Sequence, residues 1–161
     1  MSAPAPTTSD APSLVLASGS PYRRALLERL GLPFRQRPAD VDEAPRPGES
    51  PAELVRRLAR AKAETVAGQE PGSIVIGSDQ VAVRGEEILG KPGDAEHAVL
   101  QLTRSAGRHV EFLTAVCVLS TAHPSELEEH IDITRVTFRP LPPEEIRRYV
   151  EREPPFDCAG S

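Results

Sequence analysis

The stretch that decides the fold reads LVLASGSPYRRALLERLG and covers residues 14–31. Its first four residues, Leu14–Ala17, form an apolar run that predicts a short strand. The segment Pro21–Leu30 predicts a helix, because Ser20 is a good N-cap, a proline takes the first helical position, and Gly31 follows the end. The stretch therefore predicts a strand, a tight loop of small residues and a helix whose first turn carries two arginines.

Helices and strands alternate along the rest of the chain. A capping box at residues 50–53, with the sequence SPAE, predicts a second helix whose apolar stripe runs through Leu54, Leu58, Ala61 and Thr65. The other expected elements are a strand at 73–77, a hairpin with arms at 81–83 and 88–89, a helix from Asp94 to near Gly107, strands at 109–119 and 131–138, and a helix near 143–152. This alternation indicates the α/β class.

The composition is typical of one globular domain. Hydrophobic residues make up 39% of the 161 residues, and the core must be mostly aliphatic because there are four Phe, two Tyr and no Trp. We expect a single domain over residues 14–161, preceded by a flexible tail at 1–13 that is rich in Pro, Ala, Ser and Thr. No apolar stretch approaches the roughly 20 residues that cross a bilayer, so we expect no membrane partner.

The charge balance and the cysteines narrow the expected setting. A formal net charge of -5 argues against nucleic acid as a partner, since contacts with the phosphate backbone normally need a basic face. Cys117 and Cys158 lie far apart and form no CxxC motif. We therefore expect a reducing, cytoplasmic location, although the sequence leaves a pairing of the two cysteines open.

The loop before the first helix predicts an anion site. A helix N-terminus presents unpaired N–H groups and a partial positive charge, and small residues before it let an anion approach. The side chains that we expect to contribute are those of Ser18, Ser20, Arg23 and Arg24. The alternative is that Ser20 serves only as a helix cap and that both arginines are solvated surface residues.

Lysine is rare in this chain, and its two occurrences are candidate phosphate ligands. Of the 19 basic residues, 17 are arginines and only Lys62 and Lys91 are lysines. A compact ammonium meets phosphate oxygens as a point charge, which a guanidinium does not reproduce. Retention by chance is the alternative, but Lys62 lies among apolar helix residues and Lys91 follows the expected hairpin.

Acidic residues complete the expected site. Asp79 stands just beyond the expected strand at 73–77, and ligands of α/β sheets favour the carboxyl ends of strands. Carboxylates of the DVDE segment at residues 40–43 could hold Mg²⁺ or Mn²⁺, hard cations that favour oxygen ligands and bridge phosphates. The alternative, which is weaker for Glu43 than for Asp40 and Asp42, is an ordinary solvated loop.

Six motifs in this order resemble the Maf family of nucleotide pyrophosphatases. They are SGSPYRR at 18–24, DVDE at 40–43, LARAKA at 58–63, GSDQV at 77–81, GKP at 90–92 and DCAGS at 157–161. The resemblance implies an α/β fold built on an extended mixed β-sheet, with a cleft between two lobes. It also implies an enzyme that depends on a divalent metal cation and hydrolyses a nucleoside triphosphate to the monophosphate and pyrophosphate.

The resemblance also assigns roles by position. Asp79 matches the family's catalytic carboxylate, the general base that activates water for attack at the α-phosphorus, and with Glu43 it is an expected metal ligand. The residues expected to bind the triphosphate are Ser18, Ser20, Arg23, Arg24, Lys62 and Lys91. The implied partners are a nucleoside triphosphate substrate and a second copy of the chain in a homodimer.

Two residues favour one branch of the family. The segment GSDQ at 77–80 resembles the branch that acts on 7-methyl-GTP, whereas the branch that acts on dTTP and UTP usually has Thr in place of Gln80. Tyr22 places a ring where the pyrimidine branch tends to have arginine, and a ring face attracts the cationic 7-methylguanine. Gln80 can read a base edge because its amide both donates and accepts hydrogen bonds. The alternative for Tyr22 is packing on the core.

The chain departs from the family pattern at its end. The family continues beyond the DCAGS motif through a further strand portion and a helix, whereas this sequence stops at Ser161, so we expect that a C-terminal part is missing. The alternative functions are a catalytically weak nucleotide-binding regulator linked to septum formation, and a pyrophosphatase acting on dTTP and UTP or on other modified triphosphates.

Overall fold

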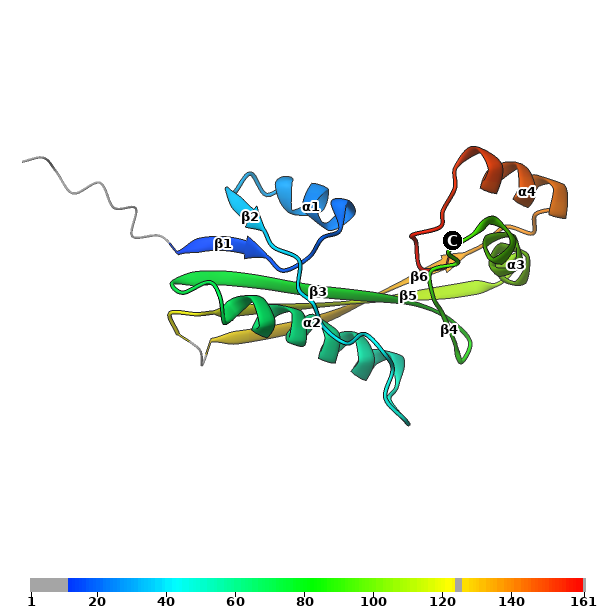
Figure 1. Ribbon diagram of the computed structural model, residues 1–161. Helices are drawn as coiled ribbons and strands as arrows, with labels where there is room; N and C mark the ends of the chain where they lie inside the picture. Colours follow the sequence, from blue (N-terminus) through cyan, green and yellow to red (C-terminus); the bar gives the residue numbers. More distant parts are fainter. Residues whose placement is uncertain (1–11, 124–125, 161) are drawn as a thin grey trace, which may run out of the picture.

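The computed structural model describes residues 12–123 and 126–160 and shows an elongated α/β fold (Figure 1). Most of the expected flexible tail, residues 1–11, lies outside the described residues, and Ser13 at its end already belongs to the first strand. Ser161, the last residue of the DCAGS motif, also lies outside them. The α/β class predicted from the sequence is confirmed.

Ten elements make up the described part of the chain. The strands are β1 (Ser13–Leu16), β2 (Phe34–Gln36), β3 (Ser73–Arg84), β4 (Glu87–Leu89), β5 (His109–Ser120) and β6 (Leu127–Thr137). The helices are α1 (Pro21–Glu28), α2 (Pro51–Ala67), α3 (Ala95–Ser105) and α4 (Pro143–Arg152). The strands form one mixed sheet in the order β2-β1-β3-β5-β6, with β4 paired to β3. β1 is parallel to its two neighbours, whereas the other pairs are antiparallel.

β3 joins the expected strand and the first arm of the expected hairpin into one strand of 12 residues. The prediction that Asp79 lies beyond the carboxyl end of a strand is therefore wrong, because Asp79 is an internal residue of β3. The physical reason is the partner strand, since β5 pairs with β3 from Ile74 to Val83 and keeps the backbone extended through the polar Gly-Ser-Asp-Gln segment.

One edge of β3 is open beside Asp79. β1 pairs with this edge only as far as Ile76, and β4 pairs with it from Ala82 onward. Between these two points, no strand of the described residues occupies the edge. Asp79 thus lies just past the carboxyl end of β1, and ligands in α/β sheets bind near such ends.

α2 covers one face of the sheet (Figure 1). Its capping box is confirmed, because Ser50 and Glu53 each accept a hydrogen bond from the backbone of the other. Leu54 and Leu58 of the expected stripe are buried, whereas Thr65 is exposed and Lys62 and Val66 are buried in its place. The core residues between α2 and the sheet include Val15, Val55, Leu58, Ala59, Ala63, Val66, Val75, Val81, Leu113 and Cys117.

Gly77 sets how closely α2 approaches β3. A Cβ atom at this position would lie 2.1 Å from the carbonyl oxygen of Ala59 and 2.7 Å from the backbone nitrogen of Ala63. Both contacts are with the backbone of α2, so only a shift of the helix would relieve them.

We expect Gly77→Ala to lower the free energy of unfolding by about 1–3 kcal/mol or more, because the added methyl group overpacks the interface. Chemical denaturation checks the prediction. Gly68→Ala is the matched control, since a Cβ there meets only ordinary contacts of 3.8 Å. Equal stability of the two variants would contradict the close approach.

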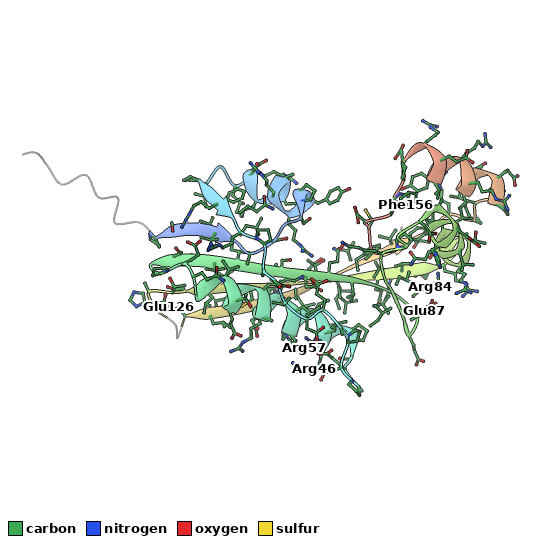
Figure 2. The ribbon with its side chains drawn as sticks, viewed as in Figure 1. Arg46, Arg57, Arg84, Glu87, Glu126 and Phe156 are labelled. Atoms are coloured by element: carbon green, nitrogen blue, oxygen red, sulfur yellow. The ribbon has the colours of Figure 1, made fainter. Side chains whose placement is uncertain are left out.

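Two lobes stand on the side of the sheet opposite α2 (Figure 1). One lobe contains α1 beside β1 and β2, and the other packs α3 against α4 around Ala98, Leu102, Ile146 and Val150. Arg84 fixes the second lobe to β3, because it donates to Ser105 Oγ over 3.0 Å and pairs with Glu87 Oε2 over 2.5 Å (Figure 2). The two-lobed arrangement implied by the family resemblance is thus confirmed.

The structure also tests the expectations about the cysteines and about membrane-spanning segments. Cys117 and Cys158 are both free, so the pairing that the sequence left open is absent. Cys117 is fully buried, and its burial raises the pKa of the thiol to about 11. Among the described helices, none has both the length and the apolar character that a membrane span requires.

Candidate active site

A pocket of about 440 Å³ is lined by residues from both lobes. Its volume lies in the range typical of ligand sites. The lining residues are Ala17, Ser18, Gly19, Ser20, Pro21, Tyr22, Arg23, Ala39, Glu43, Lys62, Lys91 and Asp157. Most of the site residues predicted from the sequence are therefore brought together here from five separate segments of the chain.

The loop between β1 and α1 is held by its own hydroxyl groups. Ser18 Oγ accepts a hydrogen bond from the Ser20 backbone over 3.1 Å, and Ser20 Oγ caps α1 by accepting one from the Arg23 backbone over 3.3 Å. Gln36 of β2 donates from Nε2 to the carbonyl oxygen of Ser18 over 2.7 Å. Sequence reasoning gave no role to Gln36, and no local motif marks it.

The two arginines of α1 differ in their contacts. Arg23 lines the pocket and donates from Nη1 to Ser18 Oγ over 3.3 Å. Arg24 instead pairs with Glu28 one turn along the helix, over 2.9 Å, and is not part of the pocket wall. The structure therefore places Arg23 with the expected anion-binding loop but leaves Arg24 on the outer surface of α1.

Lys62 joins the two acidic residues that the sequence singled out. Its Nζ atom lies 2.7 Å from Asp79 Oδ1 and 2.6 Å from Glu43 Oε1. Lys62 is 7% exposed and Asp79 is 7% exposed, so the first of these ion pairs is buried. Within the described residues, the hydrogen bond from Lys62 goes to Asp79 Oδ1, and Oδ2 has no hydrogen-bond partner. Every fully buried side-chain oxygen of these residues has a partner, so Oδ2 is not fully buried and is accessible to solvent.

The acidic loop that carries Glu43 is anchored to α2 by Arg57. Arg57 donates to both carboxylate oxygens of Glu49, over 2.6 and 2.8 Å, and to the carbonyl oxygen of Ala44 over 3.0 Å. Figure 2 shows Arg57 and Arg46 together near the start of α2.

A hydrogen bond from Lys62 lowers the pKa of Glu43, and the charges of Lys62, Lys91 and Arg23 lower it further. Glu43 is thus kept ionised.

Lys91 and Asp157 reach the pocket from the second lobe. They are brought together because the Gly93 backbone donates to the carbonyl oxygen of Phe156 over 3.2 Å, which ties the GKP motif to the DCAGS motif. Figure 2 shows Phe156 on the side of the second lobe that faces α1. The DCAGS motif is one of the six that carry the family resemblance, but the sequence indicated no role for Asp157.

Tyr22 lies at the rim of the pocket and is 66% exposed, so it does not pack on the core. Its hydroxyl group faces the C-terminal segment. Coulombic interaction with Cys158, a hydrogen bond with that side chain and the charge of Asp157 all raise the pKa of Tyr22. The ring therefore lies between the first turn of α1 and the DCAGS motif of the other lobe.

Gln80 is not part of the pocket wall. Successive residues of a strand point to opposite faces, so Gln80 lies on the face opposite Asp79. Its Nε2 atom donates to Thr114 Oγ1 on the neighbouring strand over 2.7 Å. Ala82 follows Gln80 by two residues and therefore lies on the same face of the sheet, where it packs against Gly160. Gln80 thus shares this face with the C-terminal segment.

Glu43 in the pocket wall and Asp79, which Lys62 links to it, fit a magnesium or manganese ion shared with a substrate. No group of three or more His, Cys, Asp or Glu residues gathers within the described part of the chain. Mg²⁺, however, is usually bound by one or two carboxylates together with waters and substrate phosphates. Glu43 and Asp79 supply two carboxylates that already converge on one positive charge, the Lys62 ammonium.

Comparison with known proteins gives a consistent picture over almost the whole chain. The family model described as "Maf-like protein" matches residues 13–161. A protein of Alcanivorax borkumensis named 7-methyl-GTP pyrophosphatase is 49% identical over 96% of this chain and 78% of its own length. Proteins of the same name from Pseudomonas aeruginosa and Bordetella pertussis are 53% and 51% identical, each over 93% of this chain and over 78% and 74% of their own lengths.

Solved structures support the fold. The Ham1 protein of Staphylococcus aureus superposes with a TM-score of 0.53 at 17% identity, covering 76% of this chain and 70% of that chain. A HAM1 protein of Coxiella burnetii gives a TM-score of 0.50 at 14% identity, covering 77% and 71%. At these identities the likeness concerns the arrangement of strands and helices.

Proposed function

The chain belongs to the Maf family, and from this membership we propose that it is a nucleoside triphosphate pyrophosphatase whose substrate is 7-methyl-GTP. The products would be 7-methyl-GMP and pyrophosphate. The observation that carries the proposal is that Lys62 pairs with both Glu43 and Asp79, while Glu43 and Lys62 line a pocket that also contains the hydroxyl-rich loop before α1. Three relatives of about 50% identity that bear this enzyme's name support the choice of base.

One part of the pocket suits a triphosphate. The hydroxyl groups of Ser18 and Ser20 stand at the N-terminus of α1, and the cations Arg23, Lys62 and Lys91 line the same pocket. Such donors offset the negative charge that the phosphates carry and that develops during the reaction. Arg24 is expected to contribute little, because Glu28 already neutralises it at the surface.

Asp79 is the residue that we assign as general base. Its Oδ1 atom is held by Lys62, which fixes the side chain, while Oδ2 is free to accept the proton of a water molecule that attacks the α-phosphorus. Glu43 and Asp79 would hold a Mg²⁺ or Mn²⁺ ion, which would supply charge neutralisation on the phosphate oxygens. Lys62 pairs with both carboxylates and so holds them in place for either role.

The base would lie toward Tyr22. A cationic 7-methylguanine stacked on this ring gains a cation–π interaction of about 0.5–2 kcal/mol that neutral guanine lacks. Gln80 donates one of its two N–H groups to Thr114, which leaves the other N–H and the amide oxygen for contact with a base edge. The expectations of a cytoplasmic location and of a homodimer stay predictions.

Kinetics on a panel of triphosphates test the proposed substrate. 7-Methyl-GTP, GTP, dTTP and UTP are supplied with Mg²⁺ and with Mn²⁺, and pyrophosphate release is measured. We expect the highest kcat/KM with 7-methyl-GTP and no turnover without a divalent cation. A preference for dTTP or UTP would assign the chain to the other branch, and nucleotide binding without turnover would favour the regulator.

The two arginines of α1 provide an internal test of the pocket. Arg23→Gln is expected to lower kcat/KM for 7-methyl-GTP at least tenfold, which is about 1.4 kcal/mol, because a cation that faces the phosphates is lost. Arg24→Gln removes the same charge one residue away but outside the pocket wall, and is expected to change kcat/KM less than twofold. Equal losses would show that overall charge, and not the position of Arg23, determines activity.

A further inference from the structure

Asp157 and Tyr22 are two residues of the pocket wall that the phosphate-binding part of the proposal does not use. Both line the pocket, and they come from opposite lobes. Arg23, next to Tyr22 in the first turn of α1, donates to Ser18 Oγ and so lies with the hydroxyl-rich loop. The charge of Asp157 acts instead on the Tyr22 hydroxyl and raises its pKa.

Asp157 is an unpaired carboxylate. Asp157 is exposed at the pocket wall, and within residues 12–123 and 126–160 its side chain forms no ion pair and accepts no hydrogen bond. The carboxylate of Asp157 therefore stays available for a ligand with positive charge or with N–H donors.

The segment that carries Asp157 is anchored on both sides. Before it, the Phe156 carbonyl oxygen accepts from Gly93, and the Cys158 backbone donates to the Pro155 carbonyl oxygen over 3.3 Å. After it, Gly160 packs against Ala82 of β3, with 3.1 Å between a Cβ built on the glycine and that of Ala82. The position of the carboxylate is thus set by the fold.

We propose that Asp157 is a specificity-determining residue that selects a positively charged purine base, and this inference rests on the proposed function. Methylation at N7 gives guanine a positive charge, which a carboxylate attracts and which neutral guanine lacks. The same charge strengthens the N–H groups of the base as donors, and hydrogen bonds to an ionised carboxylate are stronger than neutral ones. Asp157 would act together with Tyr22, whose ring would contact the same cationic base from another side.

The test compares two substrates in one variant. Asp157→Asn is expected to lower kcat/KM for 7-methyl-GTP at least tenfold and to change kcat/KM for GTP less than threefold. Asp157→Glu retains the charge and is expected to recover part of the preference. Glu153→Gln is the matched control, because Glu153 is an exposed carboxylate of the same segment outside the pocket wall, and its ratio of the two substrates should equal that of the wild type.

Two results would overturn the proposal. One is that Asp157→Asn unfolds like the wild type and keeps the wild-type ratio of kcat/KM for 7-methyl-GTP to kcat/KM for GTP. The other is an equal loss of kcat/KM for both substrates, with activity restored by extra Mg²⁺, which would make Asp157 a metal ligand.

Titration calorimetry with 7-methyl-GMP and GMP separates this inference from the proposed function. It needs no turnover, so Asp157 is tested even if the chain hydrolyses neither triphosphate. We expect the wild type to bind 7-methyl-GMP more tightly than GMP. In Asp157→Asn we expect the ratio of the two dissociation constants to shift at least tenfold toward equal binding. A wild type that binds both monophosphates equally, or a preference that survives in Asp157→Asn, would contradict selection by Asp157.

Discussion

Asp79→Asn is expected to abolish turnover almost completely while leaving the fold and much of the nucleotide binding intact. The amide keeps the shape of the side chain, and its oxygen can still accept the hydrogen bond from Lys62 Nζ that spans 2.7 Å in the wild type. What is lost is the carboxylate that accepts a proton from water, an effect worth about 10²–10⁴-fold in rate. Single-turnover kinetics with 7-methyl-GTP measure this loss.

Binding of an unreactive triphosphate analogue provides the control for Asp79→Asn. We expect its dissociation constant to rise less than about tenfold, since the phosphate-binding residues are unchanged. A kcat near that of the wild type would remove Asp79 from the mechanism. A large loss of binding with unchanged kcat would instead make Asp79 a residue that only binds substrate.

The second large effect is expected for Lys62→Arg. The Lys62 side chain occupies a site that is 7% exposed, and its ammonium contacts two carboxylates at once. A planar guanidinium is larger and cannot take the place of this point charge without moving Glu43 or Asp79. We expect kcat/KM to fall at least tenfold, about 1.4 kcal/mol in transition-state stabilisation.

Arg60→Lys is the matched control, because it makes the opposite exchange on the same helix at an exposed ion pair with Glu64. We expect it to change kcat/KM less than twofold. Lys62→Met supplies a second measurement by NMR titration: the hydrogen bond from Lys62 is the main cause of the lowered pKa of Glu43, so that pKa should rise in the variant. Wild-type activity of Lys62→Arg would show that either cation serves at this position.

Local signals in the sequence were sufficient for the elements around the site. The capping box of α2 and the Ser20 cap of α1 are confirmed, since each depends on residues within one helical turn. Gly31, just past α1, has the positive φ of 67° that favours glycine there. The pairing of Arg24 with Glu28 also follows a local spacing, i and i+4, and could have been predicted.

Features that depend on distant residues could not be predicted in this way. β3 continues through Asp79 because β5, about 35 residues later, pairs with it throughout. Hydrophobicity correctly predicted that Leu54 and Leu58 of α2 are buried, but it could not predict the burial of Lys62, whose partners Glu43 and Asp79 lie in other parts of the chain. The hydrogen bond between Gln80 and Thr114 depends on the register of two strands, which no local motif encodes.

The position of an oxygen label tests most directly whether water attacks the α-phosphorus of 7-methyl-GTP in this pocket. The chain is incubated with 7-methyl-GTP and Mg²⁺ in ¹⁸O-labelled water, and the products are separated and weighed by mass spectrometry, with Asp79→Asn as the inactive control. We predict that ¹⁸O enters 7-methyl-GMP and that the pyrophosphate carries none. Label in pyrophosphate, or release of single phosphates, would contradict attack at the α-phosphorus and with it the assigned reaction.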